Sequence, residues 1–362
     1  MTIRRKTITP ETGVNIYNVA EKAGVSTATV SRVLNGNPKV DPTLQQRVLA
    51  VIQELKYIPN GSARSLVTKR TKRIALLISD ITNPFFSQAA RGAQDTLDQN
   101  NYQLLLANSD DQPNRELRNL ITFAQTGVDG ILIEPAILDK PSSSAQGNAR
   151  RNLAKQLEQM DLPVVGLTPD LVMPNADSVS IDEELAAFKA VDHLLALGHR
   201  KIALINGPQH SSTGSRRTTG YERALKQYNL PIRPEIIYFD HFQKETGLAG
   251  TRVLLEQHPE ISAIFAADEL IANGVIQATR VLNLQIPQDL ALACIGDGTS
   301  TAESYPPITV AAHPRGYEFG RIISQMLLER ITNGSETRLA SRAVILETRL
   351  IVRHSTVASL RG

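Results

Sequence analysis

The chain has 362 residues, enough for two or three domains that each bury a hydrophobic core. Its 41% hydrophobic and 21% charged residues are typical of a globular protein, and no run of about eighteen apolar residues predicts a membrane span. The basic N-terminus lacks the apolar segment of a secretory signal, and the single cysteine, Cys294, cannot form an internal disulfide, so we expect a cytoplasmic protein.

The formal net charge of +3 combines a basic N-terminal part with an acidic remainder. Residues 1–73 contain 13 Lys and Arg against 4 Asp and Glu, a net +9, whereas the rest contains 26 against 32, a net −6. This asymmetry is typical of a nucleic-acid-binding module joined to a separate domain. From composition alone, a merely solvated basic face is an equally good interpretation.

Residues 15–57 have the pattern of three short helices. The first repeats apolar residues at the spacing of one helix face: Ile16, Val19, Ala20 and Ala23. Gly24 can take the left-handed conformation that ends this helix, and Ser26 is a suitable N-cap for a second helix over residues 27–34. Pro42 fits the first position of a third helix.

The second of these helices presents short side chains on its outward face, which would let it enter the major groove of DNA. They are Thr27, Ala28, Thr29 and Ser31. Arg32 lies on the same face and can reach a guanine edge or a phosphate. A helix, a glycine turn and a second short helix of this kind predict a helix-turn-helix.

Beyond residue 73, short apolar runs alternate with amphipathic stretches. The predicted strands are 74–79, 103–107, 130–134, 164–167, 201–206, 236–239, 263–266 and 290–295, and the predicted helices are 87–99, 115–126, 183–197, 214–228, 247–257 and 270–282. This alternation predicts an α/β fold of parallel sheets covered by helices, long enough for two similar lobes. Ligands collect at the carboxyl ends of such strands, so we expect a site in the loops after Ser79, Glu134, Asn206, Ala266 and Ile295.

A series of motifs carries a family resemblance along nearly the whole chain. They lie at residues 16–20, 23–26, 29–35, 57–60 and 63–66, then at 80–86 (with Asn83-Pro84-Phe85-Phe86), 128–131, 197–202 and 207–208. In this combination and order the chain resembles the lactose/galactose-repressor (LacI/GalR) family of transcriptional regulators.

The resemblance implies a three-part organisation. A helix-turn-helix DNA-binding domain would span residues 1–59, and a hinge helix with its linker would span 60–72. Residues 73–362 would form a two-lobed, periplasmic-binding-protein-like domain that binds an effector and dimerises. In this domain the chain would cross between the lobes near 168–176, 298–306 and 335–342.

The resemblance also implies which residues of the helix-turn-helix domain and the hinge contact DNA. They are Tyr17, Ser26, Thr27, Ala28, Thr29, Ser31, Arg32, Asn35, Asn60, Ala63 and Leu66. Thr27 and Ala28 match the principal base-reading positions, and Ala28 can offer only a methyl group. Leu66 matches the hinge leucine that wedges between base steps in the minor groove, which costs the duplex roughly a few kcal/mol.

The residues implied for the effector site lie in the loops of the second part. They are Asn83, Phe85, Phe86, Thr213, Arg217, Phe242, Asp268 and Asp297. Arg217 matches an arginine that clamps ligand oxygens, with Arg216 as the alternative, and either phenylalanine could instead belong to the core. Residues 294–298 depart from the family pattern, because the aromatic residue before Asp297 is missing and the loop is about one residue short.

Together these features predict a cytoplasmic, nucleoid-associated repressor. It would bind a near-palindromic operator as a homodimer, and a sugar or related effector in the cleft between the lobes would shift its conformational equilibrium.

The sequence disfavours two other classes of protein. We find no dinucleotide-binding or phosphate-binding glycine motif, nucleophile elbow or paired Cys/His spacing, so neither an enzyme nor a bound metal or cofactor is predicted. A solute-binding protein for transport is disfavoured by the basic head.

Overall fold

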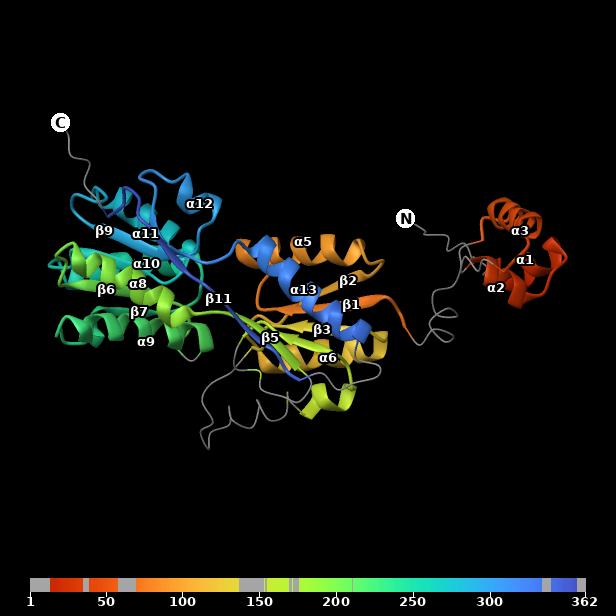
Figure 1. The fold of residues 1–362 in the computed structure, drawn as a ribbon. Coiled ribbons are helices and arrows are strands. Elements are labelled where there is room, and N and C mark those ends of the chain that lie inside the picture. Colours follow the sequence, from red (N-terminus) through yellow and green to blue (C-terminus); the bar gives the residue numbers. More distant parts are fainter. Residues whose placement is uncertain are drawn as a thin grey trace, which may run out of the picture. The chain divides into compact units, whose positions relative to one another are not determined.

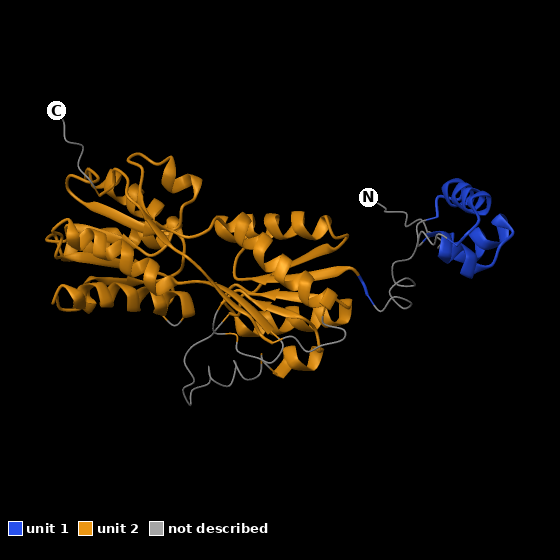
Figure 2. Ribbon diagram, viewed as in Figure 1, with its two compact units in different colours: residues 1–71 blue, residues 72–362 orange. Residues whose placement is uncertain are grey.

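The structure, a computed structural model, describes residues 14–34, 39–57, 70–136, 153, 155–168, 171, 176–209, 211–333 and 340–356. The chain divides into two compact units, Met1–Thr71 and Lys72–Gly362 (Figure 2).

The first unit contains α1 (Ile16–Ala23), α2 (Thr27–Leu34) and α3 (Pro42–Glu54). Asn15 caps α1, and Gly24 ends it with φ of 65°, the left-handed conformation expected for this turn. The Asp41 carboxylate accepts hydrogen bonds from the first amides of α3. The three helices bury one small core, formed mainly by Val19, Ala20, Ala23, Val30, Val33, Val48 and Val51. The predicted helix-turn-helix is therefore confirmed.

The second unit contains two six-stranded sheets. Figure 1 shows them as two separate groups of strands, each with helices beside it. The first has the order β11 (Ala343–Leu346), β5 (Ala176–Ile181), β4 (Val164–Gly166), β3 (Gly130–Ile133), β1 (Arg73–Ile78) and β2 (Gln103–Asn108). The second has the order β12 (Arg349–Ile351), β10 (Thr309–Ala312), β9 (Ala291–Ile295), β8 (Ala263–Ala266), β6 (Ile202–Asn206) and β7 (Ile237–Phe239). All pairs are parallel except β10 with β12.

Helices cover both faces of each sheet, and each sheet with its helices is one lobe. Lobe 1 carries α5 (Pro84–Asp98) and α13 (Gly316–Asn333) on one face and α6 (Pro113–Thr126) on the other. Lobe 2 carries α8 (Glu183–Ala196) and α9 (Ser212–Gln227) on one face, and α10 (Lys244–Gln257) and α11 (Glu269–Val281) on the other. The short elements η1 (Pro234–Ile236) and α12 (Thr299–Ala302) complete lobe 2. The predicted two-lobed architecture is confirmed.

The chain crosses between the lobes three times, at places other than those predicted. The strand order puts the crossings at 181–183, 313–315 and 347–348, so the predictions near 168–176, 298–306 and 335–342 are wrong. Three unpredicted strands, β5, β10 and β11, cause the difference. The clearest case is β5, which buries Asp177, Ser178 and Ser180 and so lacks the apolar run by which a buried strand is recognised.

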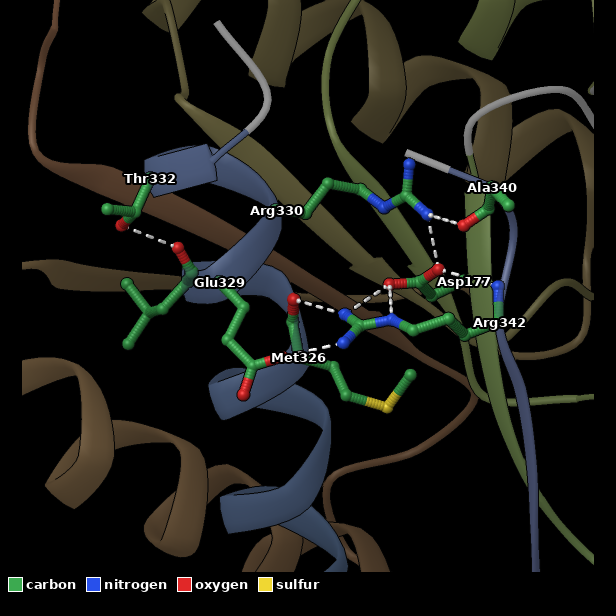
Figure 3. Close-up of polar contacts among 8 residues, drawn as sticks. Asp177, Met326, Glu329, Arg330, Thr332, Ala340 and Arg342 are labelled. Carbon is green, nitrogen blue, oxygen red and sulfur yellow. Dashed lines mark hydrogen bonds and ion pairs between the residues drawn. The ribbon is translucent and has the colours of Figure 1, made fainter. Parts of the chain in front are cut away.

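A buried ion-pair cluster, the Asp177 cluster, joins three segments of lobe 1 (Figure 3). The fully buried Asp177 on β5 pairs with Arg330 of α13 and with Arg342, whose Nη2 lies 2.7 Å from Asp177 Oδ2. The Arg342 backbone amide also donates to Asp177, and Arg330 donates to the Ala340 carbonyl. Burial raises the pKa of Asp177, but the hydrogen bonds from both arginines outweigh this and lower it. The cluster therefore fastens α13 and the segment before β11 to the sheet.

Candidate functional site

A cavity of about 620 Å³ opens between the two lobes of the second unit. Its walls come from the loops after β1, β3, β6, β8 and β9 and from the crossing segments. It therefore lies at the carboxyl ends of the parallel strands, where ligands bind in doubly wound folds. All the effector residues implied by the sequence line it: Asn83, Phe85, Phe86, Thr213, Arg217, Phe242, Asp268 and Asp297.

On the lobe 1 side, the start of α5 supplies three of these residues. Asn83 caps the helix, its side chain accepting a hydrogen bond of 2.9 Å from the Phe85 amide. Phe85 packs its ring against Phe86, His313 and Phe319 at centroid distances of 5.4, 5.0 and 5.3 Å. Phe85 thus contributes to the core as well as to the cavity wall, so the two interpretations of this residue do not exclude each other.

Arg217 is held by protein groups on the lobe 2 side. Its Nε donates to Glu183 Oε2 at 2.7 Å, its Nη1 donates to the Ala267 carbonyl at 2.6 Å, and Asp268 Oδ2 lies 4.0 Å from Nη1. Its guanidinium carbon also lies 5.3 Å from the centroid of the Phe242 ring. Burial opposes the charge of Arg217, but Glu183 outweighs this and raises its pKa. The other candidate arginine, Arg216, lines the same cavity.

The two predicted aspartates differ in how they are engaged. Asp268 caps α11 through the Leu270 amide at 2.8 Å, and burial raises its pKa despite Arg217. Asp297 forms a partly buried ion pair with Arg353, which also donates to the Ile308 carbonyl. The chain itself therefore neutralises Asp297.

The remaining two predicted residues complete the lobe 2 wall. Thr213 is partly buried in the first turn of α9, whose N-cap is Ser211. The Phe242 ring lies so close to Gly207 that a Cβ there would overlap it, so a residue with a side chain could not occupy position 207 without moving the ring.

Sequence reasoning missed several acidic groups of the cavity wall, among them Glu134, Glu183 and Glu269. Burial and the nearby Asp111 raise the pKa of Glu134 to about 8, and burial and Asp268 raise the pKa of Glu269 to about 7. Their positions were predictable, because each directly follows a strand or begins a helix at the ligand-binding edge. That Glu183 pairs with Arg217, whereas no described cation pairs with Glu134 or Glu269, was not predictable, because it depends on which side chains the fold brings near.

In the first unit, the structure describes seven of the predicted DNA contacts. Tyr17 is 71% exposed, and Ala28 and Arg32 are exposed on α2, while Thr27 and Ser31 are partly buried. The Ser26 and Thr29 hydroxyls lie 3.0 Å apart, and Ser26 accepts from the Thr29 amide, so this pair caps α2. Asn35, Asn60, Ala63 and Leu66 lie outside the described residues.

Comparisons with known proteins agree with this division. Residues 15–60 match the family of bacterial regulatory proteins, lacI family, and residues 191–356 match the periplasmic binding protein-like domain. The HTH-type transcriptional regulator DegA of Bacillus subtilis is 33% identical over 347 residues, which cover 94% of this chain and 97% of that protein. The chain belongs to the lacI family.

Further members of the lacI family are similar over the same length. The ribose operon repressor of Haemophilus influenzae is 32% identical, over 93% of this chain and 97% of that protein. The structure of the transcriptional regulator CelR in complex with cellobiose has a TM-score of 0.67 and 29% identity, over 94% of this chain and 99% of that one. This lacI-family chain is accordingly a transcriptional regulator.

This lacI-family regulator has neither a metal-binding cluster nor a membrane-spanning helix among its described residues. Among the described residues, no group of three or more His, Cys, Asp or Glu side chains is arranged to hold a metal ion. No helix in the described ranges is long and apolar enough to cross a membrane.

Proposed function

We propose that this regulator is a repressor that binds a near-palindromic operator as a dimer and responds to a sugar-like effector. The observation that carries the proposal is the cavity of about 620 Å³, with walls from both lobes, in a chain that begins with a helix-turn-helix. Sites for small organic ligands have this size and shape. The bound cellobiose of CelR and the name of the ribose operon repressor support a sugar as the effector class. A regulatory role without catalysis is consistent with the relatives, which are named as regulators.

The cavity residues suit the two kinds of surface that a sugar presents. The rings of Phe86 and Phe242 can pack against its apolar face, while Asp268 can accept hydrogen bonds from its hydroxyl groups. Arg217 holds this part of the wall in place, because it donates hydrogen bonds to Glu183 and to the Ala267 carbonyl. In this proposal Arg217 shapes the wall of the binding site, and its guanidinium group is already hydrogen-bonded to other protein groups.

The proposed response follows from the connectivity of the lobes. Effector binding would favour a closed arrangement about the crossings at 181–183, 313–315 and 347–348, which join the lobes. Strand β1 starts at Arg73, so lobe 1 receives the chain directly from the proposed linker. A change in lobe 1 would then alter whether two hinge segments, each with Leu66, can pair on the operator.

Deleting residues 1–66 tests whether operator binding and effector binding belong to different parts of the chain. We expect the shortened chain to lose operator binding and to keep effector binding, measured by fluorescence anisotropy with a duplex selected from random DNA and by calorimetry. Operator binding by the shortened chain would contradict the proposal.

The recognition helix can be tested by Arg32→Ala in the full chain. Loss of a base or phosphate contact should weaken binding to the selected duplex roughly tenfold or more. Lys22→Ala is the matched control, because it removes one positive charge from a residue that already pairs with Glu54 at 2.7 Å. Equal effects of the two substitutions would show that net charge alone matters.

The hinge can be tested by Leu66→Ala. Removing a side chain that wedges between base steps should weaken operator binding, because the kinked duplex is no longer stabilised. Effector affinity, measured in parallel, is the control. Equal loss of both affinities would contradict the hinge assignment.

A further inference from the structure

Carboxylates occupy both walls of the effector cavity. Those on lobe 1 are Asp80, Asp110, Asp111 and Glu134, and those on lobe 2 are Glu183, Asp268, Glu269 and Asp297. The positively charged side chains that line the same cavity are Arg216, Arg217 and Arg315, with His241 and His313 as further titratable groups. Acidic side chains therefore outnumber arginines in the cavity wall, so a phosphate or carboxylate on a ligand would find few positively charged partners.

On lobe 2 the chain supplies cations to most of these carboxylates. Arg217 pairs with Glu183 and lies near Asp268, and Arg353 pairs with Asp297. Glu269 is the exception: it accepts a hydrogen bond from the Ser300 hydroxyl, and no described cation pairs with it.

On lobe 1 one ion pair lies at the rim of the cavity. Asp110 pairs with Arg115, and both side chains are more than 40% exposed. Deeper in, Glu134 accepts a hydrogen bond of 3.3 Å from the Ser79 amide, and no described residue forms an ion pair with it. The charged groups that act on Glu134 are Asp111, after β2, and Glu183, at the start of α8 on the opposite lobe. Both are acids, which is why burial and repulsion together raise the pKa of Glu134.

The raised pKa keeps a proton on Glu134 near neutral pH, and a cation that arrives with the ligand can replace that proton with an ion pair. An isolated buried charge is costly, and such groups are concentrated at functional sites. A metal ion does not fit this role, because no metal-binding group of side chains is found among the described residues. An ammonium group on an organic ligand does fit, because it donates three hydrogen bonds and neutralises the charge.

We propose, building on the proposed function, that the effector is an amine-bearing sugar or polyol whose ammonium group binds to Glu134. Glu183 repels Glu134 from lobe 2, and an ammonium group at Glu134 would offset this repulsion. Offsetting it favours the closed arrangement. Glu134 is in this view the residue that selects the charge of the effector.

Matched sugars test this inference on the full chain. The probes are glucose, galactose and mannose, their 2-amino-2-deoxy forms and their 6-phosphates, with affinity measured by thermal shift and calorimetry. We expect one amino sugar to bind at least about tenfold more tightly than its neutral parent, and the phosphate not to bind. Glu134→Gln should bring the affinity ratio of the amino sugar to its parent close to one.

Glu116→Gln is the matched control, because Glu116 is a buried carboxylate of lobe 1 that does not line the cavity. This variant should keep the amino-sugar preference. Tighter binding of a neutral sugar or a phosphate, or a preference that survives Glu134→Gln, would overturn the inference and leave the proposed function intact. If no probe binds, the sugar-like effector of the proposed function fails, and the inference fails with it.

Discussion

Two carboxyl groups at opposite ends of one sheet have opposite electrostatic environments. Asp177 lies near the amino end of β5 and is completely buried, yet its pKa is lowered, because Arg330 and Arg342 supply hydrogen bonds. Glu134 follows the carboxyl end of β3, and burial raises its pKa to about 8.

The comparison shows that burial alone does not determine the state of an acid in this protein. At the amino end, α13 and the segment before β11 bring two arginines to one carboxylate, and the result is a structural clamp. At the carboxyl end, no described residue forms an ion pair with Glu134. The uncompensated carboxylate faces the cavity, where a ligand can reach it.

Asp177→Ala should have the largest effect on stability, because it removes the carboxylate that pairs with Arg330 and Arg342. This change leaves Arg330 buried without its carboxylate, so the free energy of unfolding should fall by about 3–5 kcal/mol in urea denaturation. Glu329→Ala is the control, because it removes the exposed partner of Arg342 from the same network. That control should cost less than about 1 kcal/mol. A similar cost for both substitutions would mean that Asp177 has no special structural role.

Arg217→Met tests the compensated wall of lobe 2. It leaves Glu183 and Asp268 without their cation, and we expect a loss of about 3 kcal/mol in unfolding free energy at pH 8. The loss should be smaller at pH 5, because the pKa of Asp268 is already raised by burial and protonation removes the repulsion. Arg223→Met, which removes an exposed arginine of the same helix from its ion pair with Glu184, should cost less than about 1 kcal/mol. A loss that does not depend on pH would point to packing as the cause.

Glu134→Gln should stabilise the protein, in contrast to the first two changes. The folded-state pKa of about 8 exceeds the ordinary value of 4.5, so the folded protein keeps a proton that the unfolded chain releases as the pH rises. The native Glu134 therefore lowers stability progressively between these values. We expect the variant to gain on the order of 1 kcal/mol at pH 8 and much less at pH 5, measured by thermal unfolding. A constant gain across this range would argue against the raised pKa.

The smallest expected effect concerns Gly298, which lies against Glu269. A Cβ at position 298 would overlap the Glu269 carboxylate, so Gly298→Ala should displace the end of this side chain. Because a flexible side chain can move, stability should change by less than about 1 kcal/mol. A larger loss would mean that Glu269 is held as firmly as Asp177.

Much of the fold was predictable because periodic patterns are local. The apolar runs of β1, β3, β6, β8 and β9 and the amphipathic helices between them were recognised in order. The elements that were missed depend on distant partners. Strand β5 could not be recognised from its own residues, because its buried Asp177 is compensated by Arg330 and Arg342. These arginines come 153 and 165 residues later in the chain.

The sequence by itself determined the head and its turn at Gly24, the order of strands and helices, and the family motifs, since each depends on neighbouring residues. It also located the loops that line the cavity, because parallel strands bring their carboxyl ends to one edge. Only the tertiary structure decided where the chain crosses between lobes, that Asp297 is neutralised by Arg353, and that no described residue forms an ion pair with Glu134. These outcomes depend on which charges meet across the fold, and Coulomb interactions follow distance in space and not separation along the chain.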